Sequence, residues 1–335
     1  MTGAVVVRTP QGLYCPAGDF HIDPWRKVER AVITHAHADH ARTGHGRYLC
    51  ARRGVGVLRA RLGAIEVQGL AWNERLELGE ATVSLHPAGH ILGSAQVRIE
   101  VDGEVWVVAG DYHLSVQGDT NPTCDPFEAV PCHVFVTEAT FGLPIYRWPR
   151  HSQVFGAIDA WWRANAAAGE ASFVGAYSLG KTQHVLAGVD ASLGPLYVHP
   201  AAEAINAAHV AEGIALPLVR PWRELERPGS LRGALIVAPP GAQAPWRWQR
   251  DVRVRESFAS GWMLQHAARH RTGLDRGFVL SDHADWPGLL AAVAATGCER
   301  VVITHGDDAV LGPVLAQRGL EVGSFRTTFG TDAVT

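Results

Sequence analysis

Lysine is almost missing from this sequence. Lys27 and Lys181 are its only lysines, so arginine carries nearly all of the positive charge. A genome rich in G and C prefers arginine codons, and this preference explains the bias without any function. It does not explain why residues 41–65 lack Asp and Glu but hold a cluster of arginines: Arg42, Arg47, Arg52, Arg53, Arg59 and Arg61. Because guanidinium groups make bidentate contacts with phosphates, we expect this arginine cluster to bind phosphate groups.

Cysteine is also scarce, and its spacing argues against two kinds of site. The five cysteines are an odd number without any C-x-x-C pair: Cys15, Cys50, Cys124, Cys132 and Cys298. This pattern disfavours both a disulfide framework and a zinc site made of thiolates. We therefore expect reduced thiols that are mostly buried.

Long apolar runs are missing too. No stretch approaches the roughly 18 apolar residues that a membrane-spanning helix needs, and the N-terminal apolar run is too short for a signal peptide. The chain has 335 residues, 47% of them hydrophobic and 19% charged, which allows one large domain or two smaller ones. A net charge of −3 is not the global signature of a nucleic-acid binder. We expect a soluble cytoplasmic protein.

Short apolar runs bounded by Gly, Pro or polar residues recur along the chain and predict buried strands. Examples lie at 30–33, 105–109, 133–137, 172–177, 196–199, 234–238 and 301–304. Ala-rich segments between them predict helices at 154–168, 201–212 and 289–296. Strands that alternate with helices indicate an α/β fold.

The residues suited to chemistry are unevenly distributed. One group lies before about Phe141 and a second after about Leu280, while the middle of the chain holds few candidate ligands. This distribution predicts one catalytic domain built from both ends of the chain, residues 1–150 and 262–335. A second α/β module, residues 151–261, would be inserted between them.

The clearest chemical signal is the motif H-x-H-x-D-H, whose ligand-type residues are His35, His37, Asp39 and His40. The motif follows a predicted strand, and a strand end is a rigid platform for metal ligands. Imidazole nitrogen combined with carboxylate oxygen suits zinc, and also manganese or iron. A single histidine is usually a core or surface residue, but this density of ligands is hard to obtain by chance.

Further ligands are needed to hold two metal ions. His90 lies in a turn flanked by glycines, while Asp111 and His305 each follow or end a predicted strand. A carboxylate at a strand end can bridge two metals. Each of the three has an alternative interpretation as a capping or surface residue, but together with the first motif they favour a metal site.

The motifs H-x-H-x-D-H at 35–40, A-G-H-x-L-G-S at 88–94 and A-G-D-Y at 109–112 resemble those of the metallo-β-lactamase superfamily. The resemblance implies an αβ/βα sandwich with two divalent metal ions, zinc or manganese, at one edge. It implies that one metal is held by His35, His37 and His90. It implies that the other is held by Asp39, His40 and His305, with Asp111 bridging the two. An upstream aspartate normally supports these ligands, and spacing leaves that role open between Asp19 and Asp23.

Four further segments resemble the motifs of the β-CASP nucleases, which carry a short α/β domain inserted into that sandwich: 136–142, 177–183, 280–285 and 303–307. The resemblance covers almost the whole chain and is specific to nucleic-acid hydrolases. It makes Glu138 and His283 a hydrogen-bonded pair near the leaving-group oxygen and counts them, with Asp39, as catalytic.

Lys181 lies at the predicted start of a helix that runs through Val189. A helix N-terminus together with a cation suits phosphate. We therefore expect Ser178 and Lys181, in the motif Y-S-L-G-K-T-Q, to contact nucleic acid. The alternative is that Lys181 is a solvated surface lysine.

The expected chemistry follows from the residue types. Two metal ions about 3.5–4 Å apart can clamp a phosphodiester and generate hydroxide near neutral pH. A histidine steered by a carboxylate can supply the proton that the leaving alkoxide needs.

Segments 12–16, 22–26 and 260–263 most resemble bacterial ligase-associated DNA exonucleases, which are also described as relatives of messenger-RNA 3′-end processing factors. This resemblance implies a DNA exonuclease that acts in repair on single strands or duplex ends. Its implied partners are an ATP-dependent DNA ligase and a helicase, with no membrane partner.

Three other functions stay open at this point. The first is an RNA nuclease of the 3′-end-processing or RNase J type, which shares the same hydrolysis. The second is a non-catalytic nucleic-acid scaffold, which the filled ligand positions disfavour. The third is a small-molecule hydrolase of the lactamase or glyoxalase type, which Glu138, His283 and the inserted module disfavour.

Overall fold

The chain forms two units in the computed structural model, which describes residues 4–115, 119–227, 229–242, 252–265, 273–306 and 308–325. Unit 1 comprises Met1–Ser115, Cys124–Arg147 and His283–Thr335. Unit 2 comprises Val116–Thr123 and Trp148–Asp282. Within the described ranges, no helix has the length and apolar character needed to cross a bilayer.

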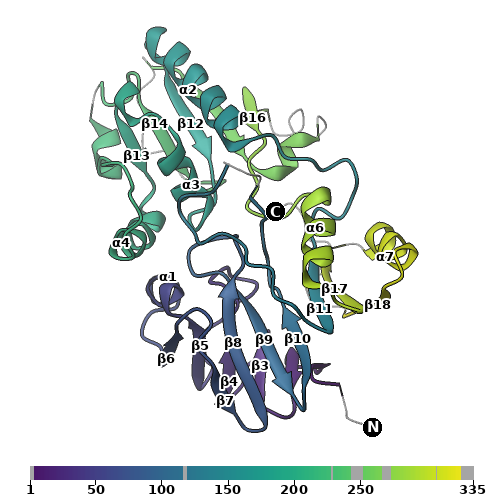
Figure 1. Cartoon of the computed structure of the whole chain (residues 1–335). Helices are drawn as coiled ribbons and strands as arrows, with labels where there is room; N and C mark the ends of the chain where they lie inside the picture. Colours follow the sequence, from purple (N-terminus) through teal and green to yellow (C-terminus); the bar gives the residue numbers. More distant parts are fainter. Residues whose placement is uncertain are drawn as a thin grey trace. The chain divides into compact units, whose positions relative to one another are not determined.

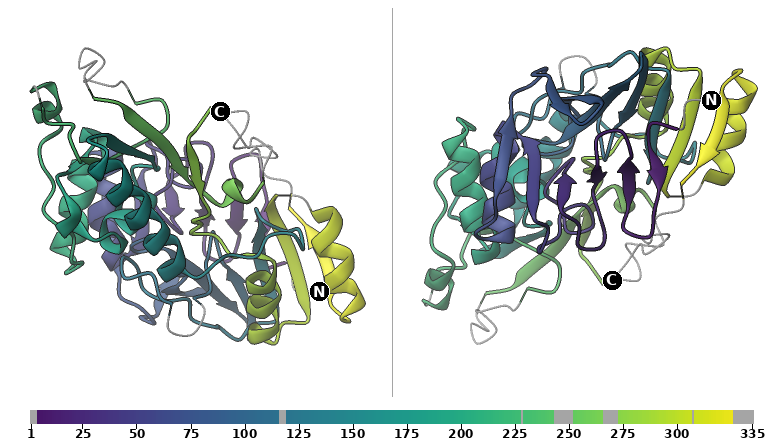
Figure 2. Two further views of the ribbon diagram at one scale, coloured as in Figure 1. Left: turned by 90° about the horizontal axis from the view of Figure 1, so that it is seen from above. Right: turned by 90° about the horizontal axis from the view of Figure 1, so that it is seen from below.

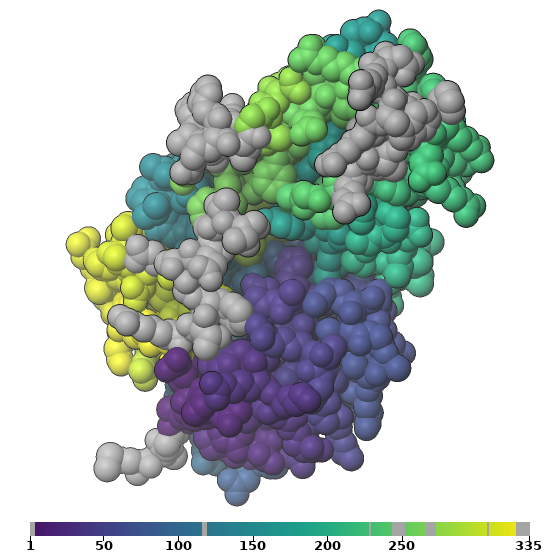
Figure 3. All heavy atoms as spheres, turned by 180° about the vertical axis from the view of Figure 1, so that it is seen from behind, coloured from purple at the N-terminus to yellow at the C-terminus, as the bar shows by residue number. Residues whose placement is uncertain are grey.

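Unit 1 begins with a six-stranded sheet whose strands pair in chain order. The strands are β1 (Val7–Arg8), β2 (Leu13–Cys15), β3 (Phe20–Ile22), β4 (Arg30–Val32), β5 (Arg47–Ala51) and β6 (Val67–Leu70). The pairs from β1 to β3 are antiparallel and those from β3 to β6 are parallel. The helix α1 (Val55–Leu62) lies between β5 and β6 in the chain. Figure 2 (right) shows the purple strands of this sheet side by side, and Figure 3 shows the purple and blue segments as one continuous surface.

The second sheet of unit 1 has seven strands. They are β7 (Leu76–Leu78), β8 (Ala81–Pro87), β9 (Ala95–Val101), β10 (Glu104–Val108), β11 (Val134–Ala139), β17 (Arg300–Gly306) and β18 (Glu321–Ser324), paired in the order β18-β17-β11-β10-β9-β8-β7. Both β8 and β10 are antiparallel to β9, and β10, β11 and β17 are mutually parallel. The strands β8, β10, β11 and β17 therefore all run in the same direction, and their carboxyl ends lie at one edge (Figure 1).

The core of unit 1 has two layers because the second sheet is buried on both faces. In β10, Trp106 packs into the apolar core that the two sheets share, while the next residue, Val107, packs into the core on the opposite face. Helices α6 (Trp286–Thr296) and α7 (Asp308–Gln317) cover that opposite face. Alternate residues of a strand point to opposite faces, so a strand buried on both sides reads as a continuous apolar run.

Unit 2 is built on one parallel sheet of five strands, ordered β13-β14-β12-β15-β16. The strands are β12 (Ala171–Gly175), β13 (Leu196–Val198), β14 (Leu235–Ala238), β15 (Val254–Ala259) and β16 (Arg276–Phe278). The helices α2 (His151–Ala167) and α3 (Lys181–Gly188) pack on one face through Ile158, Trp162 and Leu186. A smaller apolar cluster around Tyr197 and Ile236 fills the other face. A further helix, α4 (Glu203–Ala211), follows β13 (Figure 1).

The mixed α/β fold expected from the sequence is confirmed. Every strand and helix that the apolar and Ala-rich segments predicted is present, with ends that differ by a few residues. The helix expected at Lys181 begins there, after Gly180, whose φ of 84° favours glycine. All five cysteines are free, and Cys15, Cys50 and Cys298 are buried.

Candidate metal centre

Histidines and carboxylates from four strand ends lie at one edge of unit 1. His90 follows β8, Asp111 follows β10, Glu138 lies near the end of β11, and His305 lies near the end of β17. These strands run in the same direction, so residues that are far apart in the sequence meet at the same edge.

The loop after β4 adds the histidines of the H-x-H-x-D-H motif. The carbonyl oxygen of His37 accepts hydrogen bonds from the backbone N–H groups of His40 (3.2 Å) and Ala41 (2.8 Å). This turn places the ring of His40 against Asp111, with Nε2 3.4 Å from Oδ2.

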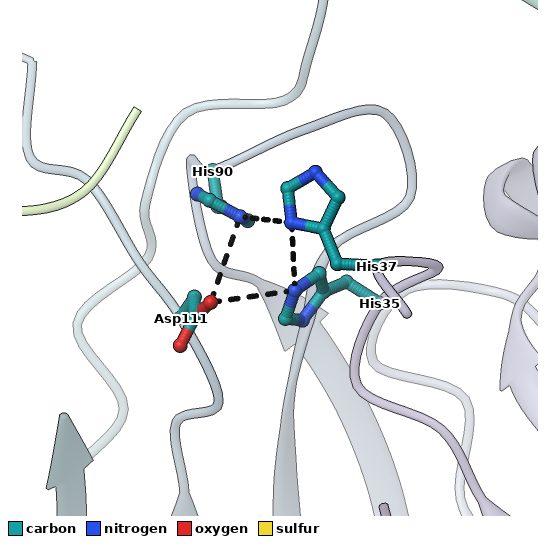
Figure 4. A group of neighbouring side chains, drawn as sticks. All are labelled: His35, His37, His90 and Asp111. Carbon is teal, nitrogen blue, oxygen red and sulfur yellow. Dashed lines mark hydrogen bonds and ion pairs between the residues drawn. The ribbon is translucent and has the colours of Figure 1, made fainter. Parts of the chain in front are cut away.

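Four side chains converge on one point in this edge (Figure 4). Nδ1 of His37 lies 3.1 Å from Nε2 of His35 and 3.0 Å from Nε2 of His90. Oδ2 of Asp111 lies 3.4 Å from Nε2 of His35 and 3.8 Å from Nε2 of His90. Ligand atoms of a tetrahedral zinc ion, each about 2.0–2.1 Å from the metal, are about 3.3 Å apart. The spacing of these four atoms therefore fits a metal ion.

The charge states of the cluster also suit a metal. Burial and the neighbouring His40 lower the pKa of His35 well below its usual value, so the ring is neutral. Burial alone would raise the pKa of Asp111, but His40 and His283 outweigh it and hold that pKa well below its usual range. Metal ions bind neutral imidazole and ionised carboxylate.

The second expected ligand set lies beside the first. Asp39, His40 and His305 line a small cavity of about 20 Å³. The rings of His40 and His305 stack with centroids 4.9 Å apart, and Oδ2 of Asp39 lies 3.7 Å from Nε2 of His40. Within the described residues, the buried Nε2 of His40 has no hydrogen-bond partner. A buried nitrogen without a hydrogen bond, close to carboxylate oxygens, fits a second metal ion, although these residues are not part of the four-residue cluster.

The structure distinguishes between the two upstream aspartates. Oδ2 of Asp23 lies 2.7 Å from Nδ1 of His40, and Oδ1 accepts a hydrogen bond from the backbone N–H of Thr34 at 2.8 Å. Asp19 is exposed and interacts instead with the hydroxyl of Tyr14 and with Arg30. Asp23 is therefore the aspartate that orients a ligand-type histidine.

Replacing Asp23 by asparagine should weaken metal binding by about 10- to 100-fold, as is typical when a residue that orients a metal-ligating histidine is lost. Competition with a chelator measures the affinity. Asp19→Asn is the matched control and should retain the wild-type affinity. Equal affinities in both variants would mean that Asp23 does not act through His40.

Glu138 and His283 are brought together as a hydrogen-bonded pair, with Oε2 and Nδ1 2.9 Å apart. The buried Glu138 also accepts a hydrogen bond from the backbone N–H of Tyr112 at 2.8 Å through Oε1. Nδ1 of His283 lies 3.9 Å from Oδ2 of Asp111, so the pair borders the four-residue cluster. The contribution of Tyr112 was not foreseen, because a backbone N–H leaves no signal in the residue type.

The arginine cluster is not free of acids once the chain is folded. Its ion pairs include Arg47 with Glu66 (3.6 Å), Arg52 with Glu74 (3.3 Å) and Arg53 with Asp125 (2.5 Å). Arg61 donates hydrogen bonds to the carbonyl oxygens of Ala36 and Ala41 and so holds the ligand loop. Residues 41–65 themselves contain no acid. Carboxylates from later segments nevertheless form ion pairs with three of the arginines that were expected to bind phosphate groups.

Lys181 of unit 2 is buried, so the alternative of a solvated surface lysine is wrong. Its Nζ lies 2.7 Å from Oδ2 of Asp282, and both side chains are almost fully enclosed. Ser178 is half-buried, and its carbonyl accepts a hydrogen bond from the side chain of Gln183. Lys181 thus has a carboxylate partner in place of the expected phosphate.

No family model matches the chain, but it resembles known proteins in sequence and in fold. The chain is 32% identical over 319 residues to a protein of Opitutus terrae (strain DSM 11246 / JCM 15787 / PB90-1) described as "Probable DNA ligase". The match covers 94% of this chain and 30% of that protein, so the chain spans less than a third of its relative. The fold resembles the crystal structure of a protein of unknown function from Enterococcus faecalis V583, with a TM-score of 0.57 and 14% identity, over 90% of this chain and 79% of the other.

Proposed function

We propose that this chain is a metal-dependent phosphodiesterase that acts as a DNA exonuclease in cytoplasmic DNA repair. The observation that supports this most is the cluster of His35, His37, His90 and Asp111 beside the hydrogen-bonded pair His283–Glu138. The two packed sheets with helices on an outer face fit a metallo-β-lactamase sandwich, and unit 2 fits a β-CASP insert.

The relative described as "Probable DNA ligase" supports DNA as the substrate class. We infer that the chain trims DNA strand ends, that a helicase separates the strands, and that a ligase joins the trimmed ends. The matched part is only 30% of the relative, so ligation by that protein would belong to a different part of it from the part that resembles this chain.

The side chains divide the work as follows. His35, His37 and His90 would hold one divalent ion, Asp39, His40 and His305 the other, and Asp111 would bridge them; zinc or manganese suits this donor set. Bound ions would supply Lewis-acid polarisation of the phosphodiester and a nucleophile from water near neutral pH. Asp23 and Arg61 keep the loop that carries most of these ligands in place.

The pair His283–Glu138 would handle the leaving group. The carboxylate of Glu138 accepts from Nδ1 of His283, so it fixes the ring and stabilises its protonated form. His283 is partly exposed while Glu138 is buried, so the histidine is the member of the pair that can reach a substrate. The protonated ring can then give a proton to the departing oxygen.

Digestion of matched single-stranded DNA and RNA, each labelled separately at the two ends, tests the proposal. We expect mononucleotide release from DNA that stops with chelator and returns with zinc or manganese. Unchanged hydrolysis after complete metal removal would refute the mechanism. A clear preference for RNA would assign the alternative function of an RNA nuclease.

Replacing His283 by alanine should slow cleavage by about 10²–10⁴-fold, the usual contribution of a general acid. Metal content, measured by mass spectrometry of the purified protein, should stay at the wild-type value. His21→Gln, a histidine in β3 of the same unit, serves as the control with wild-type rates. Loss of metal in His283→Ala would instead make His283 a ligand, as its place beside Asp111 and Glu138 also allows.

A further inference from the structure

A surface cavity of about 620 Å³ lies in unit 1 next to the metal centre, and we call it the Trp25 pocket. Its wall includes Ala38 and Ala41, which flank the ligand-type residues Asp39 and His40. Trp25 lines both this cavity and the small cavity beside His40 and His305. The two cavities therefore share a wall.

The wall of the Trp25 pocket is strongly basic. It contains Arg26, Lys27, Arg42 and Arg61, and no Asp or Glu. Arg26 and Lys27 are exposed, and neither forms an ion pair within the part of the chain that the structure describes. Among those residues, these two cations differ from Arg47 and its neighbours in the arginine cluster because no carboxylate neutralises them.

A buried hydrogen-bond donor in the same wall also points to a ligand. His45 is buried, and its Nδ1 accepts a hydrogen bond from the backbone N–H of Val28 at 3.3 Å. Burial, His21 and Arg42 lower the pKa of His45, so the ring is neutral and its proton is on Nε2. Among the described residues, Nε2 is buried without a hydrogen-bond partner. Buried donors are normally paired with a protein group or an ordered water, so this N–H is open to an acceptor that the described residues do not supply.

The wall is also held in shape before any ligand arrives. The hydroxyl of Tyr48 donates to the carbonyl oxygen of Arg42 at 2.8 Å and accepts from the N–H of His45 at 3.1 Å. The indole N–H of Trp25 donates to the carbonyl oxygen of Pro10 at 2.8 Å, which fixes the ring. A fixed aromatic face beside cations suits a nucleobase next to its phosphate.

We propose that the Trp25 pocket binds a phosphate group of the DNA strand whose phosphodiester lies at the metal centre, with an adjacent base stacked on Trp25. Arg26, Lys27 and the Nε2–H of His45 face the phosphate oxygens. Arg61 connects the pocket to the metal centre, because it also holds the carbonyl oxygens of Ala36 and Ala41 in the ligand loop. This inference rests on the proposed function and names the site that positions its substrate.

Equilibrium binding to the metal-loaded protein tests the pocket without relying on cleavage. The probe is a fluorescent phosphorothioate oligothymidylate, which resists hydrolysis, with and without a 5′-phosphate. The double variant Arg26→Gln/Lys27→Gln should raise the Kd and reduce the slope of log K against log salt by about 0.7, the contribution of one neutralised phosphate on a single strand. Trp25→Leu should raise the Kd by about 5- to 100-fold and leave the salt slope unchanged, because stacking is not ionic.

Arg75→Gln is the control for loss of a positive charge elsewhere, because Arg75 is an exposed arginine of the same unit paired with Glu100 outside the pocket. Its Kd and salt slope should stay at the wild-type values. An effect of the double variant that needs the 5′-phosphate places a terminal phosphate in the pocket, and one that does not places an internal phosphate there; both support the proposal. A double variant that binds the strand as tightly as Arg75→Gln does overturns the proposal. This holds even if inorganic phosphate raises the Tm of the wild type and not that of the double variant, because the pocket would then bind only free phosphate.

The pocket and the proposed function can fail separately. A wild-type protein that shows the binding pattern above but releases no nucleotides from ordinary DNA would refute the nuclease and leave the pocket standing. A wild-type protein that cleaves DNA in a metal-dependent way, with strand affinity indifferent to Arg26, Lys27 and Trp25, would refute the pocket alone.

Discussion

Replacing Asp111 by asparagine should remove both metal and hydrolysis. One oxygen, Oδ2, lies 3.4 Å from Nε2 of both His35 and His40, and 3.8 Å from Nε2 of His90. The side chain is buried, and His40 and His283 keep its pKa well below the usual range, although burial opposes this. The amide of the variant would keep the shape and lose the charge that compensates the surrounding imidazoles. We expect metal affinity to fall by more than the roughly 100-fold that marks the loss of a supporting residue.

Metal content after dialysis and nucleotide release from labelled DNA are the two measurements. Glu66→Gln is the isosteric control, because Glu66 is an exposed carboxylate of the same unit that forms an ion pair with Arg47. It should keep both values. An Asp111→Asn protein that retains its metal but not its activity would show that Asp111 acts on substrate and not on the metal.

Local patterns predicted the elements and the ligand motif well because both depend on neighbours in the chain. A strand buried on both faces, such as β10, reads as an unbroken apolar run. The histidines at 35, 37 and 40 lie within one loop, so their proximity needs no tertiary information. A short strand with few apolar residues, such as β7, gives no such run and was not predicted.

Partners supplied by distant segments were not predictable. Asp19 and Asp23 directly precede and follow β3, so their positions in the sequence do not show which of them supports the metal ligands. Their backbones are also alike, because both have a positive φ. The parallel pairing of β3 with β4 distinguishes them, because it sets Ile22 beside Val32 and the N–H of Asp23 bonds to the carbonyl of Val32. The side chain of Asp23 then accepts a hydrogen bond from the N–H of Thr34, at the start of the ligand loop. The acids that pair with the arginine cluster likewise come from residues after 65.

The basic wall of the Trp25 pocket was also not predictable from the sequence. Its cations come from two segments, 26–27 and 42–61, that are separated by the metal-binding loop. A search of the sequence for runs of like charge finds only the segment 42–61. The fold pairs three of the six arginines of that segment with carboxylates, whereas Arg26 and Lys27, which lie in no run, are exposed cations of the pocket.

Replacing Lys181 by methionine should destabilise unit 2 strongly. Nζ of Lys181 and Oδ2 of Asp282 are 2.7 Å apart, with only 7% and 5% of the two side chains exposed. Nδ1 of His184 shares the same carboxylate at 3.0 Å. Burial lowers the pKa of Lys181, and Asp282 opposes this shift by stabilising the ammonium. Methionine fills a similar volume but leaves a buried carboxylate without its cation, a change that typically costs about 3–5 kcal/mol.

Hydrogen exchange of the α3 amides measures this loss within unit 2, where a single unfolding transition of the whole chain would not. Lys27→Met is the matched control at the only other lysine, which is exposed, and it should change stability by less than about 0.5 kcal/mol. The double variant Lys181→Met/Asp282→Leu should recover much of the protection, because no unpaired charge is left buried. Weak exchange effects in Lys181→Met, with no gain in the double variant, would show that the ion pair does not hold α3. Recovery in the double variant would instead show that Lys181 stabilises the fold of unit 2 through its ion pair with Asp282.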